Sequence, residues 1–136
     1  MPNVFLTKAK KKNLTFGNIQ KLLNMAAKYA YFACFRNPDL RNRFQCCDCP
    51  MDRKMITAVR RNYKVLKGIS RNKTIPGIDD DVCTPAGWGK LAWSSIAFSE
   101  DASFKYYERF QKMVRELSEA KGMIPVEYDF WLWNQL

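Results

Sequence analysis

The sequence predicts an all-α protein, a compact bundle of about five helices, and three observations support this class. Apolar residues recur at intervals of three and four in several segments, which is the period of a helix. Prolines and glycines stand where helices would begin and end. Convincing strand patterns are few, and there is no internal repeat. With 136 residues, the chain suits one domain.

The first expected helix spans about Gly17–Phe35 and follows a basic, flexible tail over residues 1–13, so that the single helical domain comprises residues 14–136. The helix ends before Asn37-Pro38, because the residue before a proline avoids the helical conformation. Its apolar residues cover a broad face: Ile19, Leu22, Leu23, Ala26, Ala27, Ala30, Phe32 and Ala33.

The second expected helix runs from Pro50 to Gly68 and has two contrasting faces. One face is apolar and comprises Met55, Ile56, Val59, Tyr63 and Leu66. The opposite face is basic and comprises Arg53, Lys54, Arg60, Arg61, Lys64 and Lys67. A single acid, Asp52, stands in the expected first turn, where a carboxylate stabilises a helix by about 0.3–1 kcal/mol.

Three further helices are expected in the second half. The first covers about Thr84–Phe98 and begins with a capping threonine and a proline. The next starts at Ser99 and carries an apolar stripe up to Gly122. The last starts at Pro125, with Val126, Phe130 and Trp133 on one face. The tryptophans are expected in the core, Trp131 being the exception.

The charge of +10 is concentrated in one half of the chain. Residues 1–73 hold 17 Lys/Arg against 3 Asp/Glu, whereas residues 74–136 hold 6 against 10. The basic half indicates a polyanionic partner, with nucleic acid first and DNA favoured. The acidic half could contact a protein. No apolar run is long enough to span a membrane, and the N-terminus lacks a secretory signal.

The five cysteines indicate a reducing, intracellular compartment such as the cytoplasm, nucleoid or nucleus. Their number is odd, and Cys46, Cys47 and Cys49 are crowded together, which makes a poor disulfide framework. The same cluster could bind a soft metal with Cys34 or Cys83, but a structural zinc site usually shows two spaced pairs. Ordinary thiols are therefore favoured, and we expect neither a metal nor a cofactor.

The absence of histidine limits the chemistry open to this chain. It excludes the Ser-His-Asp and Cys-His arrangements, and no phosphate-binding loop of the usual forms is present. Lysine and carboxylate chemistry remain. An amine can form a Schiff base with a sugar carbonyl when burial or a neighbour activates it.

Two segments of the chain resemble a known family. The string from Pro50 to Ile56 resembles the segment around the catalytic aspartate of helix-hairpin-helix DNA glycosylases, most closely the archaeal-type 8-oxoguanine DNA glycosylase/lyases. The far end is similar to the closing helices of that branch. The matching residues there are Tyr107, Glu108, Phe110, Val114, Leu117, Ala120, Gly122, Pro125, Asp129, Leu132 and Trp133. The similarity spans roughly Ile19 to Leu136.

The resemblance implies a DNA-binding protein related to base-excision glycosylase/AP lyases that act on oxidised bases. Asp52 matches the family's catalytic aspartate, and Lys28 would be the amine nucleophile, with Lys21 as the alternative. The chain departs from the family in several ways. Lys54 replaces a histidine, the glycine-rich hairpin turn is reduced to Phe16-Gly17, and the first half of a glycosylase domain is missing. The alternative function is a non-catalytic nucleic-acid-binding or protein-interaction module in a larger complex.

The residues expected to contact nucleic acid form two groups. The first is the tail cluster, for which a phosphate-contacting arm is slightly favoured over a solubilising segment: Lys8, Lys10, Lys11 and Lys12. The second lies on the Pro50–Gly68 helix: Arg53, Lys54, Arg60, Arg61 and Lys64. Basic side chains of this kind bind phosphates, and such binding weakens steeply with salt.

Overall fold

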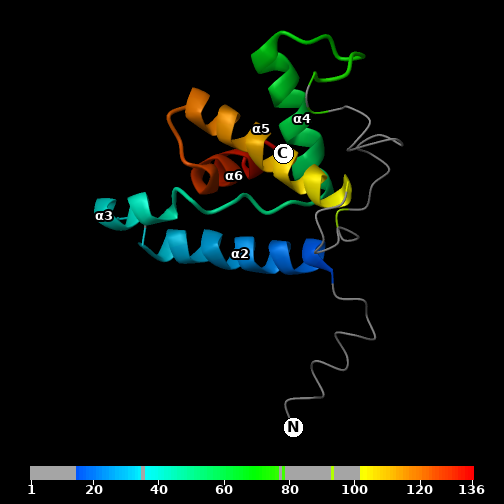
Figure 1. The fold of residues 1–136 in the computed structure, drawn as a ribbon. Helices are drawn as coiled ribbons and strands as arrows, with labels where there is room; N and C mark the ends of the chain where they lie inside the picture. The colour runs from blue at the N-terminus through cyan, green and yellow to red at the C-terminus, as the bar shows by residue number, and fades with distance from the viewer. Residues whose placement is uncertain (1–14, 35, 77, 79–92, 94–101) are drawn as a thin grey trace.

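The computed structural model describes residues 15–34, 36–76, 78, 93 and 102–136. Within these residues, the structure consists of helices and connecting segments without a strand, which confirms the predicted all-α class (Figure 1). The elements are α2 (Phe16–Cys34), α3 (Pro38–Arg41), the short 3₁₀ helix η1 (Asn42–Phe44), α4 (Arg53–Lys67), α5 (Ala102–Ala120) and α6 (Pro125–Trp133). None of the described helices has the length and apolarity needed to cross a membrane.

Several expected features lie outside the described residues. They are the tail lysines Lys8, Lys10, Lys11 and Lys12, the expected helix over Thr84–Phe98 apart from Trp93, and Cys83. The other expected helices correspond to described elements, with ends that differ by a few residues. The Asn37-Pro38 break is followed by α3, and Asn37 caps that helix by accepting the Asp39 N–H at 3.1 Å.

Helix α4 begins at Arg53, three residues after Pro50. Asp52 is therefore its N-cap rather than a first-turn acid, and Asp52 Oδ1 accepts the Met55 N–H at 2.9 Å. Gly68 ends the helix with a φ of 68°, a left-handed conformation that glycine adopts without a steric cost. Pro50 lies in the extended segment that leads into the helix.

The main core lies between α4, α5 and α6. Met55 and Val59 on α4 are fully buried, as are Phe110 and Met113 on α5 and Tyr128 on α6. These residues recur at helical spacing, so each helix contributes its apolar face to one cluster. Figure 1 shows these three helices gathered on one side of α2.

Helix α2 turns its polar stripe inward, against the usual orientation of an amphipathic helix. Gln20 and Lys28 are 3% and 8% exposed, whereas Leu22 and Leu23 are 71% and 62% exposed. The broad apolar face predicted for this helix is therefore mostly outside. The physical reason is that polar groups lie opposite the inner side of α2, chiefly the backbone of the segment before α4 and the carboxylates of α6.

Glu127 connects three helices on this inner side. Its Oε2 accepts hydrogen bonds from Tyr31 Oη on α2 at 2.6 Å and from Arg41 Nε on α3 at 3.0 Å. Its Oε1 accepts from Arg41 Nη2 at 2.6 Å and from the Ile124 N–H at 3.1 Å. The hydrogen bonds from Arg41 are the main cause that lowers the pKa of Glu127 from 4.5 to about 2.

We predict that Glu127→Gln makes stability less dependent on pH. Because the folded-state pKa lies below the unfolded value of 4.5, the stabilisation is fully present above that pH and is lost as the pH falls toward about 2. The side chain is 24% exposed, so we expect a loss of about 1–2 kcal/mol at neutral pH, less than the full shift would give.

Urea unfolding across this pH range measures the difference in the free energy of unfolding between the original chain and Glu127→Gln. This difference should shrink to near zero in acid. The exposed control Glu119→Gln should have the same free energy of unfolding as the original chain at every pH. A constant difference at every pH would contradict the prediction.

Candidate functional site

The two residues expected to carry catalysis have different partners. Lys28 on α2 is buried, and its Nζ lies 2.8 Å from Asp129 Oδ2 on α6. Asp52 caps α4 and lies 3.6 Å from the Nζ of Lys21. The structure therefore pairs the alternative lysine, Lys21, with Asp52, and pairs Lys28 with Asp129, for which the sequence predicts no catalytic role.

Asp129 is the buried acid at the centre of this site, with 0% of its side chain exposed. Burial is the main cause that raises the pKa of the Asp129 carboxyl, and the nearby Lys28 ammonium opposes that rise. One signal in the sequence points to Asp129. It is the only acid on a face of α6 whose other members, Val126, Tyr128 and Leu132, are apolar and buried.

Cys49 completes the buried cluster. Its Sγ lies 3.6 Å from Asp129 Oδ1, and the side chain is fully buried. Burial, followed by the charge of Asp129, raises the pKa of the Cys49 thiol well above its usual value. The thiol form is therefore favoured and donates to the carboxylate, so Cys49 acts as a hydrogen-bond donor rather than as a nucleophile.

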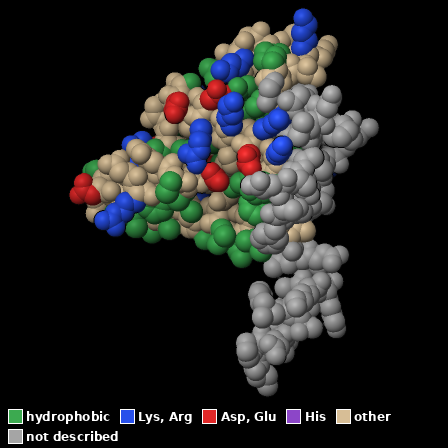
Figure 2. Space-filling model, in the orientation of Figure 1, with side chains coloured by type: hydrophobic (Ala, Val, Ile, Leu, Met, Phe, Trp, Pro, Cys, Tyr) green, Lys and Arg blue, Asp and Glu red, His purple; other side chains and the backbone are tan. Residues whose placement is uncertain are grey.

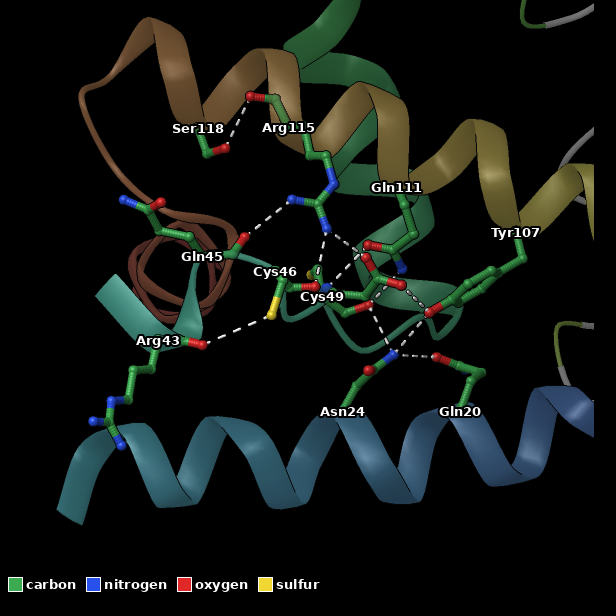
Figure 3. Close-up of polar contacts among 11 residues, drawn as sticks. Gln20, Asn24, Arg43, Gln45, Cys46, Cys49, Tyr107, Gln111, Arg115 and Ser118 are labelled. Atoms are coloured by element: carbon green, nitrogen blue, oxygen red, sulfur yellow. Dashed lines mark hydrogen bonds and ion pairs between the residues drawn. The ribbon is translucent and has the colours of Figure 1, made fainter. Parts of the chain in front are cut away.

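Two glutamines hold the extended segment that leads from Cys49 to α4, and Figure 3 shows one of them, Gln111, beside Cys49. Gln111 on α5 accepts the Cys49 N–H at 2.9 Å and donates to the Cys49 carbonyl at 2.7 Å. Gln20 on α2 accepts the Met51 N–H at 3.2 Å and donates to the Met51 carbonyl at 2.8 Å. We call this arrangement the glutamine clamp. It replaces the backbone partners that a strand or helix would provide.

Asp48 anchors the start of the same segment. Its Oδ1 accepts from Arg115 Nη2 at 2.7 Å, and its Oδ2 accepts from Tyr107 Oη at 2.7 Å. Tyr107 Oη also accepts from Asn24 Nδ2 at 3.2 Å. Burial is the main cause that raises the pKa of Tyr107, so its hydroxyl remains a donor. The segment is thus bound to α2 and α5 from both sides.

Trp133 lies at the exposed edge of the buried cluster. The side chain is 36% exposed, and its ring centroid lies 5.7 Å from Lys28 Nζ and 5.8 Å from Lys54 Nζ. Trp131, the tryptophan expected to be exposed, is half-buried against the core instead. Trp133 therefore brings a partly exposed aromatic ring, over which the Lys28 and Lys54 ammonium groups lie, next to the first turn of α4.

The basic residues predicted on α4 share one side of the helix. At 100° per residue they fall within an arc of about 120°. Arg53, Lys54 and Arg61 are exposed, whereas Arg60 and Lys64 are half-buried. Figure 2 shows Lys and Arg side chains spread over the region of α4 and α5, with acids between them. We call the set formed by Arg53, Lys54, Arg60, Arg61 and Lys64 the α4 basic face.

The predicted cysteine cluster does not converge on one point. Cys46 is exposed and its Sγ lies 3.7 Å from the Arg43 carbonyl, whereas Cys49 is buried beside Asp129. Among the described residues, no three His, Cys, Asp or Glu side chains are placed to hold a metal ion. Cys83 lies outside these residues.

No protein-family model, curated protein or solved structure matches this chain.

We predict that Gln111→Ala destabilises the fold by about 2–4 kcal/mol. The change removes both hydrogen bonds to Cys49. It leaves the buried Cys49 N–H without this partner, at a cost of about 1–3 kcal/mol, and leaves the Cys49 carbonyl with the longer bond from Asn24 Nδ2 at 3.5 Å. Denaturant unfolding measures the loss. The neighbouring exposed residue supplies the control, because Lys112→Ala should stay within about 0.5 kcal/mol of the original chain. Equal effects from the two changes would refute the role of the clamp.

Proposed function

We propose that this chain binds nucleic acid, with phosphates on the α4 basic face and an unpaired base stacked on Trp133. The observation that carries the proposal is the position of Trp133, exposed beside Lys54 at the start of that face. An accessible aromatic ring next to clustered cations is the combination that binds single-stranded or locally opened nucleic acid. DNA is the favoured ligand, as the resemblance to DNA glycosylases implies.

The two parts of this surface contribute differently. The α4 basic face supplies affinity for any sequence, because each neutralised phosphate releases counterions. Trp133 supplies stacking, which is worth about 1–3 kcal/mol per base and favours strands whose bases are free. Phe130, one turn earlier on α6, is 45% exposed and extends the apolar edge of this surface.

Binding to single-stranded and duplex DNA at several salt concentrations tests the proposal. We expect Arg53→Glu and Arg61→Glu to weaken binding of both ligands. Each change should also lower the salt slope by about one unit, because one phosphate is no longer neutralised. Trp133→Ala should weaken single-stranded binding by roughly tenfold to a hundredfold and duplex binding much less. Trp133→Phe should restore most of the single-stranded affinity.

The matched charge control is Arg43→Glu in η1, an exposed arginine that is not part of the α4 basic face. It should change affinity much less than Arg61→Glu. Equal losses from both changes would show non-specific attraction to the whole chain. Failure to bind either DNA would leave the protein-interaction alternative, with a partner at the acidic half.

A second candidate function is that of a DNA glycosylase/AP lyase with Lys28 as the nucleophile. The observation that favours it is the buried pair of Lys28 and Asp129 next to Trp133. A Schiff base requires a neutral amine, and an ammonium in an ion pair has no free electron pair. The Asp129 carboxylate, whose Oδ2 lies 2.8 Å from Lys28 Nζ, is placed to accept that proton as the amine reacts. In this role Asp129, rather than Asp52, is the acid next to the amine.

In this second candidate, the bond from Lys28 Nζ to the sugar C1′ forms as the glycosidic bond breaks. The departing base then takes up the proton that Asp129 received. Asp52 would act only through its charge, because its oxygens cap α4 and contact Lys21. A base stacked at Trp133 would lie next to this pair.

Borohydride trapping on duplexes with 8-oxoguanine or an abasic site tests this second candidate. Lys28→Arg is the sharpest variant, because guanidinium keeps the ion pair to Asp129 but cannot form an imine. Lys21→Arg is the matched control. The expected result is a covalent adduct that Lys28→Arg removes and Lys21→Arg retains. The reverse pattern would assign the nucleophile to Lys21, and no adduct with the original chain would exclude a lyase while leaving DNA binding intact.

A further inference from the structure

The outward face of α2 is an apolar surface without a partner in the described structure. Leu22, Leu23 and Tyr29 are 71%, 62% and 63% exposed, and Ala26, Ala30 and Ala33 are also exposed. Figure 2 shows hydrophobic side chains gathered along the edge of the molecule where α2 lies. Contiguous exposed apolar side chains of this kind mark a contact surface rather than a solvated one. We call these six residues, together with the half-buried Ile19, the α2 outer face.

The α2 outer face carries no charge. The only charged residues in α2 are Lys21 and Lys28, which form ion pairs with Asp52 and Asp129. Close contact between two copies of this face therefore brings no like charges together, although the whole chain carries +10. A partner selected by charge, such as an acidic protein or an anionic membrane, finds no complementary group here.

The side chains along α2 allow this face to pair with itself. Ile19, Leu22 and Leu23 lie in its first half, Tyr29, Ala30 and Ala33 lie in its second half, and Ala26 lies between them. We propose that a second copy of this chain covers the α2 outer face, with the two α2 helices antiparallel about an axis at Ala26. This proposal is independent of the proposed nucleic-acid binding.

Antiparallel pairing sets two large side chains against alanines and a third against an aromatic ring. A two-fold axis at Ala26 places Leu22 opposite Ala30 of the second copy, Ile19 opposite its Ala33 and Leu23 opposite its Tyr29. Alanine at the crossing point allows the helix axes to approach to about 8 Å. Parallel pairing would instead set leucines against leucines and leave gaps between the alanines. Antiparallel helices also place their dipoles in opposite directions, which is favourable.

The dimer leaves the other surfaces open. Figure 1 shows α4, α5 and α6 gathered on one side of α2, and the buried Gln20 and Lys28 face that side while the exposed Leu22 and Leu23 do not. The contact is limited to one helix of about 28 Å, so its area lies at the lower end of specific interfaces and we expect micromolar association. Two copies would then present two α4 basic faces in one assembly.

Analytical ultracentrifugation of the full chain over a range of concentrations tests the proposal. We expect a reversible monomer–dimer equilibrium. Leu22→Asp and Ala30→Lys should each raise the dimer dissociation constant by about a hundredfold, because each buries an unpaired charge. The double variant should recover most of this loss. In it, the carboxylate introduced in one copy meets the ammonium introduced in the other, in two symmetric ion pairs.

The control is Val65→Asp, a substitution at an exposed residue of α4 that lies off α2 and should leave the equilibrium unchanged. Circular dichroism establishes that each variant is folded, and all three substituted positions are exposed. A chain that remains monomeric up to hundreds of micromolar would overturn the proposal. Additive losses in the double variant would also overturn it, because Leu22 and Ala30 would then not face each other across a two-fold axis.

Discussion

The glutamine clamp is the interaction on which the rest of the structure depends. Cys49, Pro50 and Met51 are extended and buried, so their backbone groups need partners that neither a helix nor a strand supplies. Gln20 and Gln111 provide four hydrogen bonds from two different helices. An amide side chain suits this role because it donates and accepts at once, as a peptide group does. The clamp thereby places α2 and α5 on opposite sides of one segment.

The buried backbone of this segment explains why the polar side of α2 faces the interior. A helix that must reach a buried backbone needs amides and amines on its inner face, so Gln20, Asn24 and Lys28 lie there at intervals of four. The apolar residues of α2 are then left outside by the same periodicity, since the two stripes lie on opposite sides of one helix. The buried polar network and the exposed apolar face therefore both follow from the orientation of α2.

The ion pair of Lys28 and Asp129 follows from the same constraint. Burying one charge without the other would cost several kcal/mol, so a buried lysine on α2 requires an acid on the helix that it meets. Asp129 supplies that charge, and Cys49 donates to its second oxygen. Lys28 of this pair lies next to the Trp133 ring, and there the buried cluster reaches the surface beside the α4 basic face. The proposed stacking site and the proposed amine chemistry therefore concern adjacent groups.

The helical class and the two faces of α4 could be predicted from local sequence. Local signals set the limits and the faces of these helices, and they include Pro125, Gly68 and the spacing of Met55 and Val59. Because such signals act on neighbouring residues, the helices could be predicted without knowing their tertiary contacts. The partners in the candidate site could not be predicted in this way. Asp52 is a cap because α4 begins one residue after it, and Lys28 meets Asp129 from the far end of the chain, a separation that no local pattern reaches. The side of α2 that faces the core is likewise a property of the tertiary structure, because burial of a helix depends on the groups that it meets as well as on its own residues.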